Sequence, residues 1–143
     1  MSKSNTQETA YLKLLYQNID MANIGDAGGL QNSATAGSFY IALYKTDPTD
    51  ADSGTEATYT SYARVAVVRS AVGWTVSGAV CSNAGVITFP TSGGNNNTIT
   101  HFGIRTASSG GDLVHHAALD ASLLVSSGDT PKFAIADISI TES

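Results

Sequence analysis

The sequence has little of what staples small secreted domains or binds nucleic acids. Cys81 is the only cysteine among 143 residues, so no disulfide can form within the chain. Charged residues make up 13%, about half of the usual share in soluble proteins. The seven Lys and Arg residues are scattered and the formal net charge is -5, whereas nucleic-acid-binding proteins usually carry a basic stripe. The composition therefore argues against direct binding of DNA or RNA.

Long apolar runs are missing as well. No stretch approaches the roughly 18 consecutive apolar residues that a helix needs to cross a bilayer. The polar start of the chain, Met1–Asn5, has no apolar core of the kind that a secretory signal contains. We therefore expect a protein without a membrane segment that is made and folded in a cytoplasm.

The residues that are abundant suit short strands and tight turns. Hydrophobic residues make up 42% of the chain, which supplies enough apolar material for a core. A compact domain of this length buries roughly two-thirds of the surface that its unfolded chain exposes. The two halves do not differ in composition enough to argue for a boundary between them. We predict a single domain over residues 1–143.

One segment near the N-terminus has the periodicity of a helix. Asn5 followed by Glu8 resembles a capping box, with Thr6 as the rival cap. Gly25 suits the left-handed position that ends many helices. We therefore predict an amphipathic helix over residues 5–24. Its apolar stripe recurs at helical spacing and consists of Tyr11, Leu15, Ile19 and Ala22.

Beyond residue 37 the periodicity becomes that of strands. Short alternating runs of apolar and β-branched residues are separated by Gly, Pro and Asn. The polar stretch 45–60 between the first two runs is expected to be an exposed loop. In the last run the apolar residues change from one face of the expected strand to the other, which predicts a one-residue bulge near Asp137. The runs cover residues 39–44, 62–69, 73–76, 85–89, 99–106, 112–119, 122–125 and 131–141.

A helix followed by about eight short strands is typical of an all-β architecture. We predict a mainly β fold in which residues 38–143 form an antiparallel β-sandwich of jelly-roll type. The N-terminal helix of residues 5–24 precedes this sandwich.

No sequence pattern indicates catalysis. A Gly-x-Ser-x-Gly elbow and a phosphate-binding loop that ends in Lys-Ser or Lys-Thr are both absent. His115 and His116 are adjacent on a predicted strand, so they point to opposite faces and cannot chelate one metal together. His101 could join one of them only through the fold. We expect no catalytic residue, no cofactor, no metal site and no enzymatic activity.

The loop of residues 47–56 is the remaining candidate for an ion site. Asp47, Asp50, Asp52 and Glu56 gather carboxylates there, and calcium prefers oxygen ligands. The spacing of an EF-hand, however, would require an oxygen ligand where Gly54 stands. A solvated acidic loop is therefore favoured, and calcium binding stays open.

From residue 39 onward the order of segments resembles a family of small structural proteins in tailed-phage virions. The helix and the turn at residues 23–26 resemble this family too, so the resemblance covers nearly the whole chain. It implies a structural part of a phage particle and brings no catalytic residues. The matching segments are FYIALYKTDP at 39–48, YTSYARV at 59–65, GWTVSG at 73–78, SNA at 82–84, ITFP at 87–90, ITHFGI at 99–104 and GDLVHHAAL at 111–119.

Among virion roles, we expect capsid decoration. A decoration (cement) protein would stabilise the head through apolar contacts with the major capsid protein or other virion subunits, and few charges suit such close packing. The symmetry of capsids predicts a homo-oligomer, a trimer. The stripe Tyr11, Leu15 and Ile19 is the expected interface with a partner, and the alternative is that the helix packs on its own sandwich.

Two other functions stay open. One is a small tail, neck or fibre adaptor, although the chain is short for a fibre and has no internal repeats. The other is a carbohydrate-binding module, which a β-sandwich would allow. That module would need a row of exposed aromatic side chains, and the candidates are Tyr40, Tyr44, Tyr59 and Tyr62.

Overall fold

The computed structural model describes all residues, Met1–Ser143. Strands make up 36% of the chain and the helix 9%, and the strands pair antiparallel. The predicted fold class, mainly β with antiparallel sheets and one N-terminal helix, is confirmed. The jelly-roll order of strands stays a prediction.

The chain divides into two compact units. Unit 1 comprises residues 1–37, 68–87 and 133–143, and unit 2 comprises residues 38–67 and 88–132. The backbone therefore passes from one unit to the other after residues 37, 67, 87 and 132. The prediction of a single domain stays a prediction, and each unit is described by itself below.

Unit 1 begins with the only helix, α1 (Asn5–Gln17). Ser4 caps it, because the Ser4 hydroxyl accepts a hydrogen bond from the Gln7 amide at 3.4 Å. The capping-box spacing therefore starts at Ser4, one residue before the predicted cap. The helix ends at Asn18, which adopts the left-handed conformation with φ 56°. The predicted helix over 5–24 was seven residues too long, because Asn18 is the left-handed residue that ends it, and Gly25, also at positive φ, lies in the segment beyond the helix.

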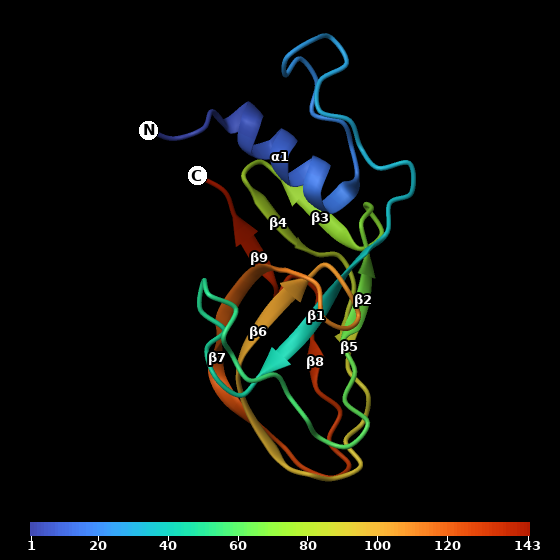
Figure 1. Ribbon diagram of the computed structural model, residues 1–143, viewed down its shortest axis with the longest axis vertical. Coiled ribbons are helices and arrows are strands. Elements are labelled where there is room, and N and C mark those ends of the chain that lie inside the picture. Colours follow the sequence, from blue (N-terminus) through green and yellow to red (C-terminus); the bar gives the residue numbers. More distant parts are fainter. The chain divides into compact units, whose positions relative to one another are not determined.

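One face of α1 packs on a hairpin of its own unit. The hairpin consists of β3 (Trp74–Ser77) and β4 (Val80–Asn83), and β9 (Ser139–Thr141) extends it to three strands. Figure 1 shows α1 lying across β3 and β4. Leu12 and Tyr16 are fully buried on this face, and the ring of Tyr16 lies 4.7 Å from that of Trp74. The helix therefore packs within its own unit.

Asn83 organises the end of unit 1. Its side-chain amide donates to the carbonyl oxygens of Gly85 and Ala134 at 2.7 and 2.8 Å, and its oxygen accepts from the Ile138 amide at 2.9 Å. These bonds hold a turn over residues 134–137 between β8 (Lys132–Phe133) and β9. The prediction of a bulge near Asp137 is therefore wrong. The apolar residues change face at a turn that separates two strands, not at a bulge within one strand.

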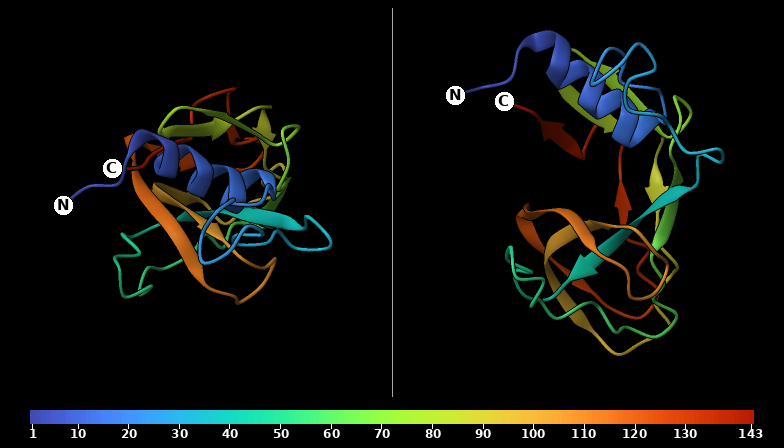
Figure 2. Two further views of the ribbon diagram at one scale, coloured as in Figure 1. Left: turned by 90° about the horizontal axis from the view of Figure 1, so that it is seen from above. Right: turned by 45° about the horizontal axis from the view of Figure 1, so that its top comes forward.

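Unit 2 is built on a four-stranded antiparallel sheet in the order β2-β1-β6-β7. In Figures 1 and 2 the gold β6 runs between the cyan β1 and the orange β7. Gly103 lies at the centre, opposite Ala42 in β1 and His116 in β7. The core side chains include Ile41, Ile99, Ile104 and Val125, each fully buried. The strands are β1 (Ser38–Tyr44), β2 (Val65–Val68), β6 (Asn97–Arg105) and β7 (Leu113–Val125).

The long strand β7 contains a bulge. Its pairing with β6 skips from Leu123 opposite Ile99 to Ala118 opposite His101. Residues 119–122 therefore lie outside the ladder with β6. The sequence predicted two strands here, over 112–119 and 122–125, and the gap between them falls at this bulge.

The remaining short pair of strands is β5 (Ile87–Thr88) with β8. The sequence runs did not predict β4, because Ser82 and Asn83 are weak strand formers.

Candidate functional site

The acidic loop of unit 2 is closed at its base by backbone hydrogen bonds. The Lys45 amide donates to the carbonyl of Thr55 at 2.8 Å, and the Ala57 amide donates to that of Leu43 at 2.8 Å. Gly54 is required inside the loop, because a Cβ at this position would lie 2.6 Å from the Cα of Pro48. The predicted exposed loop thus has a fixed conformation.

Arg105 anchors the middle of this loop to the sheet. Its guanidinium donates two hydrogen bonds to Asp52, at 2.6 and 2.7 Å, and a third to the hydroxyl of Tyr44 at 2.7 Å. Two planar bonds of this kind are the strongest geometry for an Arg–carboxylate pair. The hydrogen bonds from Arg105 lower the pKa of Asp52 below its ordinary value. Arg105 is charged and lies next to Ile104 on an alternating strand, which would favour an outward side chain, yet the loop covers it and leaves only 7% of it exposed.

Arg64 anchors the end of the loop in the same way. Its Nε and Nη2 each donate to the carboxylate of Glu56 at 2.8 Å, and the Tyr62 hydroxyl donates to Glu56 at 2.7 Å. Burial alone would raise the pKa of Glu56, but the hydrogen bonds from Arg64 and Tyr62 outweigh it, so the pKa is lowered. Nη1 of Arg64 donates to the carbonyl oxygens of Ala107 and Gly110. Arg64 therefore joins two loops of unit 2.

The other two carboxylates of the loop face histidines. His116 lies 3.5 Å from Asp47 and 3.3 Å from Asp50, and His101 lies 3.8 Å from Asp47. The fold thus brings His101 to the same acidic side chain as His116. His115, the neighbour of His116, pairs with Ile104 in β6.

Each acidic side chain of the loop thus faces a basic side chain of the sheet or its flanks. The pairing uses carboxylates that a calcium ion would need, and no group of three or more His, Cys, Asp or Glu side chains is arranged to hold a metal ion. The pairs Arg105–Asp52 and Arg64–Glu56 fasten the loop to unit 2, and together they are called the ionic clamp below. The sequence singled out the four carboxylates but missed Arg64 and Arg105 as their partners.

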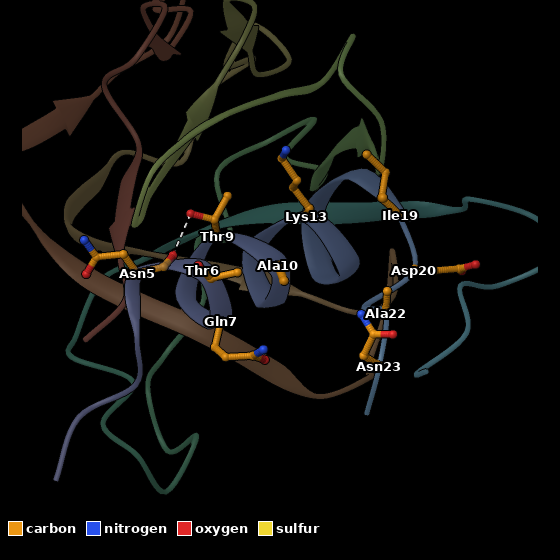
Figure 3. Close-up of a pocket in the computed structure, with 10 residues that line it drawn as sticks. All are labelled: Asn5, Thr6, Gln7, Thr9, Ala10, Lys13, Ile19, Asp20, Ala22 and Asn23. Atoms are coloured by element: carbon orange, nitrogen blue, oxygen red, sulfur yellow. Dashed lines mark hydrogen bonds between the residues drawn. The ribbon is translucent and has the colours of Figure 1, made fainter. Parts of the chain in front are cut away.

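A groove in unit 1 lies between α1 and the segment that follows it. It has a volume of about 700 Å³ and is bordered by Thr6, Ala10 and Lys13 on the helix and by Ile19 and Ala22 beyond it. Figure 3 shows these side chains, with Asp20 pointing away from the helix. The border is mixed: Ala10, Ile19 and Ala22 are apolar, and the other side chains are polar, including the charged Lys13 and Asp20.

The predicted interface residues are divided by the fold. Tyr11 is 37% exposed and Ile19 is 47% exposed, whereas Leu15 is half-buried. Ile19 lines the groove, but Tyr11 and Leu15 are not among its borders. Lys3 lies 5.8 Å above the ring of Tyr11. The three residues thus do not form one continuous stripe, because the helix ends before Ile19.

The aromatic side chains that a carbohydrate-binding module would need are not exposed. Tyr44 and Tyr59 are buried, and Tyr40 and Tyr62 are half-buried. The hydroxyls of Tyr44 and Tyr62 take part in the ionic clamp. These side chains therefore belong to the packing of unit 2 and offer no row of rings for stacking on sugars.

The only tryptophan and the only cysteine of the chain are core residues. Trp74 and Cys81 are fully buried in unit 1. Burial raises the pKa of the Cys81 thiol to about 12, so it stays protonated at neutral pH. The exposed large apolar side chains of the chain include Leu123 and Leu124 of β7, which are 42% and 58% exposed.

Residues 4–141 match the family described as Podophage GP4 fiber I protein gp80. This chain belongs to that family. The family is a structural one of tailed-phage virions, so the resemblance inferred from the segments is confirmed and the protein is a virion structural protein. As a member of this family it is located in the virion and associates with other virion components. A search of curated proteins finds no match to the chain. The single helix is too short and too polar to cross a membrane.

Proposed function

We propose that this chain is a non-enzymatic structural component of a phage fibre. The observation that carries the proposal is the match over residues 4–141 to a family described as a fiber protein. The match covers both compact units, so it concerns the whole fold and not one motif.

The site geometry suits a passive structural part. Its most organised polar cluster uses two Arg–carboxylate pairs, Arg105 with Asp52 and Arg64 with Glu56, to fasten one loop to one sheet. A fixed loop presents a constant surface to a neighbour, which lowers the entropy that binding must remove. The carboxylates of Asp52 and Glu56 are occupied by hydrogen bonds from Arg105 and Arg64, which supports a structural use of this cluster.

Capsid decoration through the major capsid protein is the second candidate function. It is favoured by the share of charged residues, 13%, because fewer ions need desolvation when subunits pack closely. Capsid symmetry would then make the protein a trimer. A fibre role makes no such demand, so the location on the particle separates the two functions.

Labelling of intact virions tests the proposal. Gold-conjugated antibodies raised against the purified chain should bind at fibres when particles are viewed by electron microscopy. Gold distributed over the whole head would instead establish decoration. An absence of gold from particles that contain the protein by mass spectrometry would contradict both exposed locations. Cleavage of host polysaccharide by the purified chain would contradict the non-enzymatic part of the proposal.

We also propose that the exposed residues near the helix, Tyr11 and Ile19, contact a virion partner, with Leu15 supporting them from below. Ile19→Asp should reduce incorporation of the protein into virions, because it places a charge in the groove. Ile24→Asp is the matched control, since Ile24 is also exposed, at 38%, and does not line the groove. Equal incorporation of the two variants would remove Ile19 from the interface.

A further inference from the structure

Two guanidinium groups lie close together beneath the acidic loop. The side chains of Arg64 and Arg105 are each 8% exposed. Both donate to the carbonyl oxygen of Gly110, Arg64 through Nη1 at 2.8 Å and Arg105 through Nε at 3.3 Å. Two positive charges are therefore concentrated where solvent hardly reaches, and a buried charge is costly unless an anion or another acceptor faces it.

A second loop, residues 107–111, also holds the two arginines. Arg64 donates to the carbonyl oxygen of Ala107, and Arg105 donates to that of Gly111, both at 2.7 Å. Gly111 has a φ of 67°, and a Cβ there would lie 2.8 Å from the Cβ of Ala107, so this loop is tightly built. Because these carbonyls do not belong to the acidic loop, Arg105 would keep its position if the acidic loop moved away.

Asp52 binds Arg105 in the way that an anionic ligand would. Its two oxygens accept from Nη1 and Nη2 of Arg105 at 2.6 and 2.7 Å. This fork is the geometry by which arginine recognises carboxylate and phosphate groups. The Tyr44 hydroxyl accepts from Nη1 as well, so it keeps its own hydrogen to donate. Arg105 and Tyr44 thus form an anion-binding group that the carboxylate of Asp52 occupies.

Asp52 is the more easily removed of the two clamp carboxylates. Its side chain is 36% exposed, against 27% for Glu56. Asp52 and Thr49 have φ values of 52° and 57°, a conformation that is rare for residues other than glycine and strained for a β-branched one. Glu56 instead forms a β-bridge with Tyr44 and so stays with the sheet. Opening of the loop would release its strain and uncover Arg105, while Arg64 kept Glu56.

From this arrangement we infer that Arg105 and Tyr44 form a latent binding site for a dianionic phosphate group, which the acidic loop closes by placing Asp52 in it. With Asp52 away, Arg64, Arg105 and Glu56 leave one net positive charge beneath the loop. The site belongs to unit 2 alone, so it does not depend on the proposed fibre role.

The charge of the ligand decides between phosphate and other anions. A free carboxylate offers the same fork and the same single charge as Asp52, but Asp52 is tethered and therefore has the higher effective concentration. A phosphodiester also carries a single charge. A phosphate monoester or inorganic phosphate is close to doubly charged at neutral pH and has three or more acceptor oxygens. Only such a dianion offers Arg105 more than its internal partner does.

Calorimetric titration of the full chain with inorganic phosphate, at about pH 8 and constant ionic strength, tests the site. Asp52→Asn should bind phosphate about tenfold more tightly than the wild type, because the apparent affinity scales with the fraction of open loop. Asp50→Asn is the matched control, since it removes the same charge from the same loop without touching Arg105, and its affinity should change less than about twofold. Equal affinity of the three proteins, or no binding to Asp52→Asn, would overturn the inference.

Two further measurements locate the phosphate. Adding Arg105→Lys to Asp52→Asn should weaken binding at least tenfold, because lysine lacks the fork. If that double variant folds poorly, hydrogen exchange in Asp52→Asn replaces it: phosphate should speed exchange of the Lys45 amide at the base of the loop, whereas sodium chloride of equal ionic strength should not. Undiminished binding by the double variant, or unchanged exchange at saturating phosphate, would place the anion elsewhere and contradict the site.

Glucose 6-phosphate distinguishes the two sources of such a dianion. Binding of this monoester to Asp52→Asn would show that the site accepts phosphate carried on a sugar. Binding of inorganic phosphate alone would restrict the site to the free ion. Either result upholds the site, and binding of neither overturns it.

Discussion

The ion pair between Asp52 and Arg105 predicts how firmly the acidic loop is held. Asp52→Asn keeps the shape of the side chain but removes the negative charge from its two hydrogen bonds with Arg105. Arg105 is 7% exposed. It would keep the Tyr44 hydroxyl and two backbone carbonyls as acceptors, but it would lose the negative charge of its carboxylate partner. The loop should therefore open more often in the variant.

The size of the effect follows from the burial of the two partners. A hydrogen bond to a charged group contributes about 1.5–3 kcal/mol. The Asp52 side chain is 36% exposed, so solvent screens part of this interaction. The amide of Asn can still accept one bond from Arg105. We expect a loss of about 1.4 kcal/mol, which corresponds to about tenfold more frequent opening.

The pH dependence has a defined sign. Hydrogen bonds from Arg105 lower the pKa of Asp52 in the folded state. The stabilisation is therefore fully present above the pKa of the unfolded chain, which is about 3.9. It is lost as the pH falls through the lower pKa of the folded state. The difference between wild type and Asp52→Asn should vanish along with it.

Amide hydrogen exchange at Lys45 measures this opening, because that amide bonds to Thr55 across the base of the loop. At pH 6 the Lys45 amide should exchange about tenfold faster in Asp52→Asn than in the wild type. Asp50→Asn is the control in the same loop: the Asp50 side chain is fully exposed and contacts only His116, so its effect should be less than about twofold. Equal effects of the two variants, or an effect of Asp52→Asn that does not diminish as the pH falls below the unfolded pKa of about 3.9, would refute the reasoning.

Three further substitutions test the packing. Asn83→Ala should lower the free energy of unfolding of the protein by about 3 kcal/mol, because three buried hydrogen bonds are lost; exposed Asn96→Ala should cost under about 0.5 kcal/mol, and urea unfolding measures both. Trp74→Phe should cost about 1 kcal/mol in thermal unfolding, because the buried indole N–H has no acceptor and its removal offsets the lost volume; a cost as large as that of Trp74→Ala would contradict this. Gly54→Ala should make the acidic loop more sensitive to proteolysis, because its Cβ would clash with the backbone of Pro48, whereas Gly85→Ala meets no atom and should be silent.

Local patterns in the sequence predicted the types of elements well and their ends less well. The helix was predicted because its apolar residues recur at helical spacing, but its end depended on which left-handed residue stops it: Asn18 and Gly25 both have positive φ, and Asn18 comes first. Asn18 takes this conformation because its side chain also bonds to the backbone of Ser33, a contact 15 residues away. No local pattern contains such a contact. The same reason explains why a turn replaced the predicted bulge near Asp137, since Asn83 holds that turn from a distant strand.

The site shows the same division. The carboxylates of the loop are visible in the sequence as a cluster, and calcium binding was a natural hypothesis for them. Their partners are not visible, because Asp52 and Arg105 are 53 residues apart and meet only when β6 pairs with β1. Strand alternation alone would place Arg105 on the face opposite Ile104, toward solvent. The alternation of side chains was informative about the face of the strand, but the loop covers that face.

The edge of β7 was only partly predictable. The sequence indicated strands on both sides of residues 120–121, and the structure shows that this gap is a bulge within one strand. That β7 is the last strand of its sheet depends on the strand order, which periodicity does not define. The position of β7 at the edge of its sheet is therefore known only from the fold.

The most direct test of the proposed fibre role is the number of copies of this chain in each purified virion, measured by quantitative mass spectrometry against the major capsid protein. A fibre component predicts a few dozen copies or fewer, in a ratio set by the symmetry of the tail. Hundreds of copies in simple ratio to the major capsid protein would contradict the fibre role and establish decoration of the head.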